Sequence, residues 1–428
     1  MITLDAADPG FETAFAALVD SRREVDTDVA TDVTAILSRV RAEGDGALID
    51  LTQKFDRFDL DAEGWSISRD ECAAAYTRLA PDLRAALDLA ANRIRAYHER
   101  QRPTDSDWTD ATGTRMGARW TAVEAAGLYV PGGRAAYPSS VLMNAIPAKV
   151  AGVERLAMVT PTPKGAINAA VLAAAHIAGV DEIWRVGGAQ AVGALAYGTA
   201  HIAPVDVIVG PGNAWVAEAK RQLYGRVGID MVAGPSEILV VADADNDPAW
   251  IAADLLSQAE HDPTSQSILI TDNAAFADAV VAAVEALLPT LSTETSARAS
   301  WDTHAAIILL GNLSDAPPLI DRLAPEHLEL AVADPDALFA RVRHAGSVFL
   351  GRHTPEAIGD YLGGPNHVLP TGRRARFASG LSVTDFMKRT SFLAATPVSI
   401  AVLGPAAATL ADAEGLPAHA ASVRARLA

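Results

Sequence analysis

The sequence predicts an α/β protein with mostly parallel sheets covered by helices. From about residue 120, short apolar runs alternate with alanine-rich helical windows, a spacing typical of strand–helix–strand units. Half of the 428 residues are apolar, so the chain can bury a large core and is expected to form two or more domains.

The charge balance and the cysteine content exclude several classes of function. With 35 basic and 53 acidic residues the net charge is −18, which argues against nucleic acid or an anionic membrane as the main partner. Cys72 is the single cysteine, so an internal disulfide and a multi-cysteine zinc site are excluded, as suits a reducing compartment. The start has no leader-like pattern, and no apolar run is long enough to span a membrane. We expect a cytoplasmic protein.

The first 100 residues are predicted to be mainly helical. Apolar residues recur at intervals of three and four in VATDVTAILSRVRAEG and PDLRAALDLAANRIRAYHERQR, as expected for amphipathic helices. His98 falls among charged residues at the end of the second of these helices, where we expect an exposed side chain.

Three glycine-rich turns follow apolar runs in the middle of the chain, at 129–133, 187–190 and 210–213. Ligands of parallel sheets lie beyond the carboxyl ends of the strands, and glycines let a phosphate approach backbone N–H groups. The dinucleotide fingerprint is only half met, because Trp215 stands at the third glycine position. Tight structural turns remain the alternative to a dinucleotide site.

The stretch from Ile229 to Asp262 combines a strand with a polar helix end. AGPSEILVVAD reads as an apolar strand opened by a turn, and DLLSQAEHD reads as a helix. On that helix Asp254, Gln258 and His261 share one face, so a carboxylate, an amide oxygen and an imidazole could hold a divalent cation. A polar helix face in water is the alternative.

The remaining chain repeats the strand–helix pattern and ends in a tail that is predicted to be helical. SILITD, HAAIILLG, HLELAV and SVFLG are predicted strands, whereas DFMKRTSF and the alanine-rich tail are predicted helices. Glu326 and His327 lie at the start of one strand. Imidazole titrates near neutral pH and an adjacent carboxylate can activate water, so the pair is either catalytic or an ordinary surface pair.

The segment that joins Asp230, AGPSE and SQAEH resembles the signature of the histidinol dehydrogenases, enzymes that oxidise L-histidinol via L-histidinal to L-histidine with two NAD. The likeness extends from about residue 25 to the end. It implies two Rossmann-like sheet domains, one inserted in the other, plus small helical N- and C-terminal segments. The implied division is 1–24 as an N-terminal helical segment, 25–128 with 239–380 as the metal and catalytic domain, 129–238 as the NAD domain, and 381–428 as a C-terminal helical domain.

The resemblance also implies site residues and partners. It makes Glu326 the activator of water and His327 the base, and it implies a homodimer with shared active sites in which Glu414 and His419 come from the partner subunit. The implied NAD contacts are Tyr129, Gln190 and Asn213; the zinc ligands are Gln258, His261, Asp360 and His419; and the substrate contacts are Ser236, Gln258, His261, His327, Asp360, His367, Glu414 and His419.

Three other functions remain open on the sequence alone. A relative on the same scaffold could oxidise another small alcohol such as a sulfonated diol, and a zinc hydrolase could use Glu326 with a metal-bound water. The third is a non-catalytic binding protein. The concentration of Glu326, His327, Asp360 and His367 in one short region argues against it.

Overall fold

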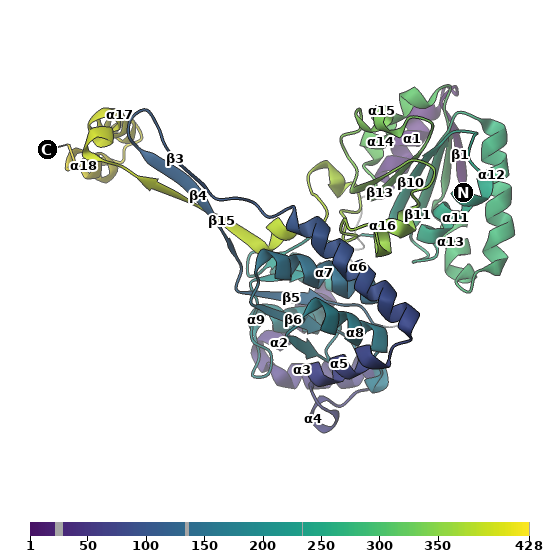
Figure 1. Cartoon of the computed structure of the whole chain (residues 1–428), viewed down its shortest axis with the longest axis horizontal. Coiled ribbons are helices and arrows are strands. Elements are labelled where there is room, and N and C mark those ends of the chain that lie inside the picture. The colour runs from purple at the N-terminus through teal and green to yellow at the C-terminus, as the bar shows by residue number, and fades with distance from the viewer. Residues whose placement is uncertain (22–28, 133–136, 233, 428) are drawn as a thin grey trace.

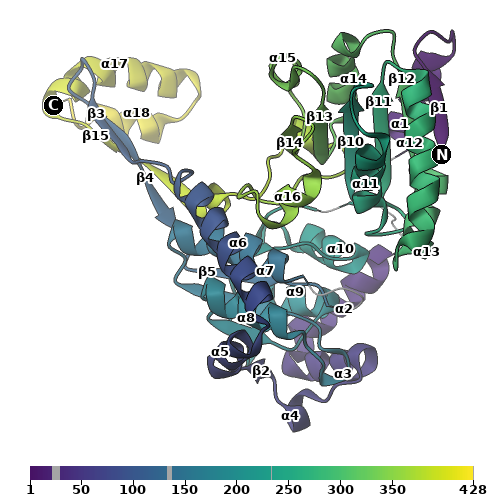
Figure 2. The same ribbon diagram turned by 45° about the vertical axis from the view of Figure 1, so that its right-hand side comes forward.

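Two six-stranded sheets and a long antiparallel arm make up the chain. The computed structural model describes residues 1–21, 29–132, 137–232 and 234–427; Gly133 of the first glycine-rich turn and Ala233 of the AGPSE motif lie outside them. The two sheet domains lie side by side, and the arm extends away from both (Figures 1 and 2). The α/β class with parallel sheets is confirmed.

The first sheet, sheet A, is entirely parallel and has helices on both faces. Its strand order is β1 (Ile2–Asp5), β12 (Ala306–Leu309), β11 (Gln266–Thr271), β10 (Glu237–Ala242), β13 (His327–Ala331), β14 (Ser347–Leu350). One face packs on α1 (Phe11–Asp20) and α14 (Ala316–Leu323), and the other on α11 (Pro248–Ala259), α12 (Ala274–Leu287) and α13 (Glu294–His304). Two short helices, α15 (Pro335–Phe339) and α16 (Glu356–Tyr361), flank β14.

The second sheet, sheet B, is parallel except at one edge. Its order is β2 (Ser66–Ile67), β7 (Glu182–Trp184), β6 (Arg155–Val159), β5 (Ala125–Tyr129), β8 (Val207–Val209), β9 (Gly228–Ile229), with β2 antiparallel to β7. The helices on one face are α5 (Arg69–Arg78), α6 (Pro81–Glu99), α7 (Pro138–Ala151) and α8 (Ala169–Ala178). Those on the other are α2 (Ala30–Glu43), α3 (Asp45–Asp56), α9 (Gly188–Tyr197) and α10 (Ala214–Leu223).

The arm is a three-stranded antiparallel sheet that carries two helices at its tip. Strands β3 (Ser106–Thr109), β4 (Arg115–Ala122) and β15 (Met387–Ala394) pair in the order β15-β4-β3. Helices α17 (Pro397–Ala413) and α18 (Pro417–Arg424) follow β15. The remaining short helices are α4 (Leu60–Glu63), η2 (Pro163–Gly165), η3 (Leu288–Thr290), η4 (Leu313–Asp315), η5 (Arg374–Arg376) and η6 (Val383–Phe386).

Strand pairing and helix packing correct three predictions about the fold. Residues 29–128 do not belong with 239–380, because their helices pack on sheet B and β2 pairs with β7. The N-terminal segment is not only helical, since β1 forms an edge of sheet A. DFMKRTSF is not a helix, because most of it lies in β15, paired along its length with β4. The insertion of one sheet domain in the other is present, but it begins near residue 29.

His98 is buried, in contrast to the exposure expected from its place at the end of α6. Its Nδ1 lies 2.8 Å from the carbonyl oxygen of Ile94, and its Nε2 lies 3.4 Å from the side-chain nitrogen of Asn366. A neutral ring with the proton on Nδ1 satisfies both contacts, because Nδ1 donates and Nε2 accepts. Burial lowers the pKa of His98. This histidine therefore joins α6 to the chain segment beside His367.

Acidification should destabilise the protein partly through His98. Its pKa is lower in the folded than in the unfolded chain, so the unfolded state binds the proton first as the pH falls below about 6.5, and stability is lost in that window. Urea unfolding at pH 7, 6 and 5 should give a shallower decline for His98→Gln, by at most about 1.4 kcal/mol per pH unit. His353→Gln, at an exposed histidine, is the control, and equal declines in all three proteins would contradict the assignment.

Candidate active site

The predicted catalytic residues gather at the amino-terminal edge of sheet A. The run EILVVA of β10 is buried throughout, as expected for an inner parallel strand, and Ser236 immediately precedes it. In the neighbouring strand His327 is the first residue and pairs with Ile238. The backbone N–H of Glu237 donates to Glu326 Oε2 at 2.9 Å. The site thus lies at the edge opposite to the usual ligand edge of a parallel sheet.

Gln258 and His261 come together at the end of α11. Asp247 caps this helix and Pro248 occupies its first position, so its buried face carries Gln258 inward. The helix ends at Ala259, and His261 lies in the turn beyond it, with Nδ1 2.7 Å from Gln258 Oε1. The imidazole thus lies against the amide oxygen, although the helix predicted to continue to Asp262 ends at Ala259.

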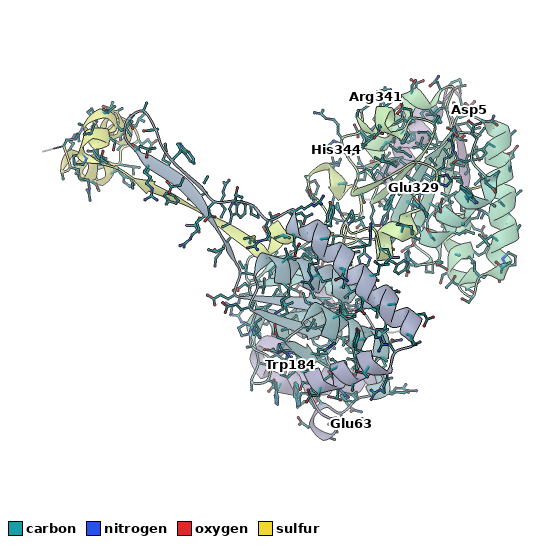
Figure 3. The ribbon with its side chains drawn as sticks, viewed as in Figure 1. Asp5, Glu63, Trp184, Glu329, Arg341 and His344 are labelled. Atoms are coloured by element: carbon teal, nitrogen blue, oxygen red, sulfur yellow. The ribbon has the colours of Figure 1, made fainter. Side chains whose placement is uncertain are left out.

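Asp254, expected on the same face, lies instead against Glu329. The two carboxyl groups share a hydrogen bond, and Glu329 lies inside the sheet A domain (Figure 3). Burial raises the pKa of Asp254 to about 6 and that of Glu329 well above its ordinary value. Two buried carboxyl groups in contact share a proton. Asp254 is therefore engaged with Glu329 and does not line the site.

His327 is the centre of the cluster. Its Nδ1 lies 3.0 Å from the carbonyl oxygen of Glu237 and 2.8 Å from the side-chain nitrogen of Gln258. One ring atom cannot donate to the first and accept from the second at once, and a proton on Nδ1 satisfies the carbonyl. Nε2 has no hydrogen-bond partner among the described residues. Burial lowers the pKa of His327, opposed by the charge of Glu356, and both features suit a neutral base.

Three carboxylates lie around the imidazole ring of His327. Its Nε2 lies 3.7 Å from Glu356 Oε1 and 3.9 Å from Asp360 Oδ1, and its Nδ1 lies 3.7 Å from Glu326 Oε2. Burial, followed by the charge of Glu356, raises the pKa of Asp360 to about 9. Burial also raises the pKa of Glu326 well above its ordinary value, and the charges of Glu237, Asp360 and Glu356 add to this.

These surroundings fit a divalent cation. Among the described residues, His327, Glu356 and Asp360 offer ligand atoms within 4.8 Å of one another, and Gln258 and His261 lie beside them. Imidazole nitrogen with carboxylate and amide oxygen is a donor set suited to zinc. A bound cation would favour the ionised form of Asp360 and so oppose the raised pKa of that carboxyl group.

His367 and Asp360 border a cavity of about 190 Å³ that reaches His327. His367 Nδ1 donates to the backbone oxygen of Asp360 at 3.0 Å, and its Nε2 lies 3.5 Å from Ser140 Oγ on α7. Burial lowers the pKa of His367 to about 4. All the residues that line the cavity come from the segment 327–369, and one of them, His367, also contacts α7 of the sheet B domain. The cavity has the polar lining of a small-molecule site.

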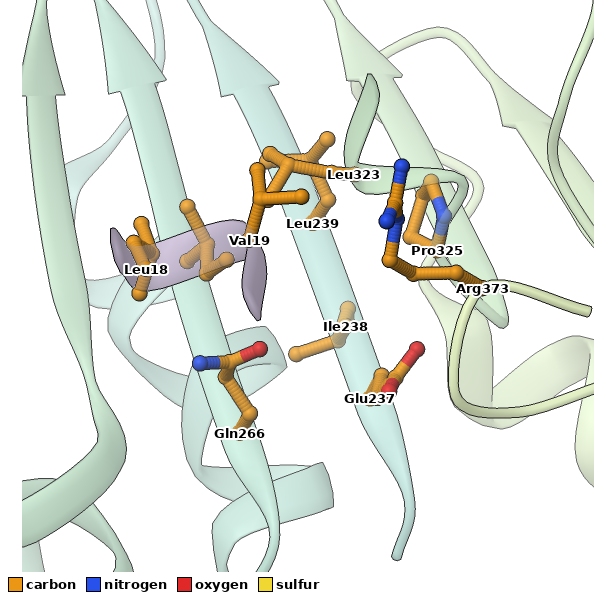
Figure 4. A pocket seen from close by; sticks show the side chains of 10 residues that line it. Leu18, Val19, Glu237, Ile238, Leu239, Gln266, Leu323, Pro325 and Arg373 are labelled. Atoms are coloured by element: carbon orange, nitrogen blue, oxygen red, sulfur yellow. The ribbon is translucent and has the colours of Figure 1, made fainter. Parts of the chain in front are cut away.

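A second, smaller cavity is lined by Glu237 at the start of β10. It measures about 20 Å³ and is bordered by Leu18, Pro325 and Arg373 as well as by β10 (Figure 4). A space of this size holds about one water molecule. It is too small for a substrate, so the 190 Å³ cavity is the candidate substrate site.

The three predicted NAD contacts lie at the carboxyl-terminal edge of sheet B, where the glycine-rich turns meet. Tyr129 ends β5, and its hydroxyl accepts a hydrogen bond from the N–H of Gly188 at 3.0 Å. Burial raises the pKa of Tyr129 to about 12. Gln190 is buried in the first turn of α9, and Asn213 caps α10 through the N–H of Val216. Two helix N-termini therefore point to one edge, which suits a phosphate-bearing ligand.

Glu414 and His419 do not reach the site of their own chain. Glu414 ends α17 and His419 lies on α18, and both side chains are exposed at the tip of the arm. Figures 1 and 2 place that tip far from α11 and β13. If these residues complete an active site, the site belongs to another copy of the chain.

Comparison with known proteins decides the family. The family model described as histidinol dehydrogenase matches residues 20–427. The chain is 66% identical over 427 residues to the histidinol dehydrogenase of Zymomonas mobilis subsp. mobilis and 65% identical over 427 residues to that of Rhodospirillum rubrum, covering 100% of this chain and 99% and 98% of those proteins. The crystal structure of histidinol dehydrogenase from Elizabethkingia anophelis is similar with a TM-score of 0.94 and 36% identity, over 100% of this chain and 98% of that one.

The chain belongs to the histidinol dehydrogenase family. It is accordingly an oxidoreductase of histidine biosynthesis. No helix within the described ranges is long and apolar enough to cross a membrane.

The sequence did not predict one residue of the cluster around His327. Glu356 is buried, accepts a hydrogen bond from the Gln258 side-chain nitrogen at 3.3 Å and another from Ser257 Oγ at 3.0 Å. Holding that nitrogen turns the amide oxygen of Gln258 toward His261. Glu356 and Asp360 stand at i and i+4 on α16, so the helical spacing of two acidic residues could have found it.

Proposed function

We propose that this protein is a zinc-dependent, NAD-linked dehydrogenase that oxidises L-histidinol via L-histidinal to L-histidine with two NAD. The observation that carries the proposal is the neutral, buried His327, whose Nε2 has no partner among the described residues and faces a cavity beside a zinc-type donor set. The single cysteine supports a cytoplasmic location.

In this proposal Gln258, His261 and Asp360 hold the metal with His419 of a second copy. Their nitrogen and oxygen atoms suit zinc, and no thiolate is needed. A bound zinc would act as an electrophile that orients the amino alcohol in the cavity. Ser236, which precedes β10, and His367, which lines the cavity, are proposed to contact the substrate, and Glu414 is added from the partner.

His327 acts as the base in both oxidations. Its Nε2 takes the proton of the histidinol hydroxyl group while a hydride moves to NAD from the carbon that carries this group. The products are histidinal, NADH and a proton. Glu326 activates a water by accepting a proton from it, and this water adds to the aldehyde. His327 then takes a proton from the hydrate as the second hydride leaves, giving histidine. The two steps consume one water and two NAD.

The proposed NAD site is the edge of sheet B formed by Tyr129, Gln190 and Asn213. Two observations support this site. The glycine-rich turns contact one another there, and the segment that carries His367 packs on the same domain. The Asn366 side chain donates to the Met143 carbonyl at 2.6 Å, so the hydride acceptor and the substrate cavity lie on adjoining domains.

A homodimer with shared active sites is part of the proposal. The arm carries large apolar side chains that are exposed, including Leu393, Val398 and Leu410 at 70%, 69% and 65%. Clustered exposed apolar residues mark an interaction surface. A second copy that covers the arm would receive Glu414 and His419, the two predicted residues that their own chain leaves at its tip.

A spectrophotometric NADH assay tests the proposal. Histidinol should yield two NADH per molecule, activity should disappear on chelation, and added zinc should restore it. Testing a panel of alcohols that includes a sulfonated diol would identify a dehydrogenase with another substrate. Product formation without NAD would indicate a hydrolase. Release of a single NADH, or full activity after thorough chelation, would refute it.

A further inference from the structure

A buried ion pair joins α10 to the residue after β9. Lys220 Nζ contacts Asp230 Oδ1, and the two side chains are only 2% and 1% exposed. Removing two charges from water is costly unless further hydrogen bonds satisfy them. Asp230 opens the sequence signature, yet it lies in neither the metal cluster nor the substrate cavity, so its role is unassigned.

The additional hydrogen bonds of the pair converge on one residue, Gly210. Lys220 Nζ donates to the Gly210 carbonyl oxygen at 3.0 Å, and Asp230 Oδ2 accepts from the Gly210 N–H at 2.8 Å. Both backbone polar groups of Gly210 are thus held, the N–H by a negative charge and the carbonyl oxygen by a positive one. Asp230 Oδ1, the oxygen that contacts Lys220, also accepts a hydrogen bond from the N–H of Met231 at 2.6 Å.

The conformation at Gly210 admits no side chain. Its φ is +114°, a region that favours glycine, and a Cβ there would lie 2.2 Å from the carbonyl oxygen of Tyr129. The turn therefore lies directly on the end of β5. Gly212 is similarly close to Val216, whose N–H is capped by Asn213. The pair holds the first residue of this turn, and the helix cap holds the last.

We infer that the buried Lys220–Asp230 ion pair is the positioning device for the turn from Gly210 to Asn213, and that it sets the affinity for NAD without touching it. This inference rests on the proposed function, which makes that turn part of the NAD site. Preorganised backbone groups bind a ligand more tightly because less ordering is left to the binding step. Metal and substrate contacts on sheet A do not depend on the pair.

The test measures NAD binding directly by titration calorimetry, alongside zinc content and KM for both substrates. Lys220→Met keeps the aliphatic stem and removes the charge, and Asp230→Asn is nearly isosteric. The double variant removes both charges and so avoids leaving one buried without its partner. In each, the Kd for NAD should rise about fivefold or more, the scale of one lost hydrogen bond. Zinc content and the KM for histidinol should stay within about twofold.

Lys149→Met is the matched control, because Lys149 pairs with Asp181 at 2.7 Å in the same domain and does not touch the turn. Its Kd for NAD should equal that of the wild type. Amide exchange across residues 207–216 should also quicken in Asp230→Asn and stay unchanged in the control.

Three outcomes would overturn the inference. The first is a lowered melting temperature with unchanged NAD binding and unchanged exchange in the turn, which indicates a purely structural pair. The second is an equal loss in Lys149→Met. The third is a wild type that binds no NAD, which removes the proposed function as well. A wild type that binds NAD without oxidising histidinol would refute the proposed function alone, because the binding comparison still decides the role of the pair.

Discussion

Replacing His327 by Asn should reduce NADH formation from histidinol by about 10²–10⁴-fold, the usual contribution of a positioned base. Asparagine can place its amide N–H near the Glu237 carbonyl, where Nδ1 of the imidazole lies at 3.0 Å, but it offers no atom that accepts a proton at the position of Nε2. The zinc content should stay near normal, because the proposed ligands are other residues. The measurement is single-turnover NADH formation together with metal analysis.

His353→Asn is a suitable control for this variant, since His353 is exposed and lies against Trp250 with ring centroids 5.5 Å apart. It should keep full activity. Unchanged turnover in His327→Asn would remove His327 from the mechanism. Loss of zinc from that variant would instead make the imidazole a metal ligand, which the cluster of His327, Glu356 and Asp360 also permits geometrically.

Most strands of sheet A could be predicted because they are short, largely apolar runs, but the edge strand β1 was missed. EILVVA and HLELA are buried along their whole length, and such runs are typical of strands inside a parallel sheet. Helix periodicity was less informative about residues 29–128. It locates an apolar face but does not say which sheet that face will cover, so these helices were assigned to the wrong domain.

Long-range pairing explains the other errors of fold prediction. DFMKRTSF has no strong local preference, and most of it becomes a strand through its pairing with residues 115–122, more than 260 positions earlier in the chain. His98 falls at the polar end of a helix, where local sequence indicates exposure. It is buried because Asn366 and its neighbours dock on that end, a contact that helix periodicity cannot reveal.

The site was predictable where neighbouring residues carry it and not where distant ones do. Gln258 and His261 share a helical spacing, and Glu326 with His327 is a contiguous pair, so local sequence brought each set together. The position of Glu356 beneath Gln258 depends on packing of α16 against α11, which strand and helix patterns do not specify. The roles of Glu414 and His419 came from family resemblance alone.

His419→Asn should remove zinc and activity, although His419 lies at the exposed tip of the arm. Losing one of four proposed protein ligands should weaken zinc binding by more than about 100-fold, beyond the effect of altering a residue that only supports a ligand. Metal analysis after gel filtration measures this. His344→Asn, at a histidine outside the proposed site, should retain its zinc, and full zinc content in His419→Asn would exclude His419 as a ligand.

The central claim is that each active site takes residues from two copies of the chain, and mixed dimers test it most directly. His327→Asn and His419→Asn homodimers should both be inactive. After co-expression in equal amounts, a mixed dimer contains one doubly damaged site and one intact site, so about a quarter of wild-type activity should return. If activity stays absent in mixtures shown to contain mixed dimers, every site is built from a single chain and the account is contradicted.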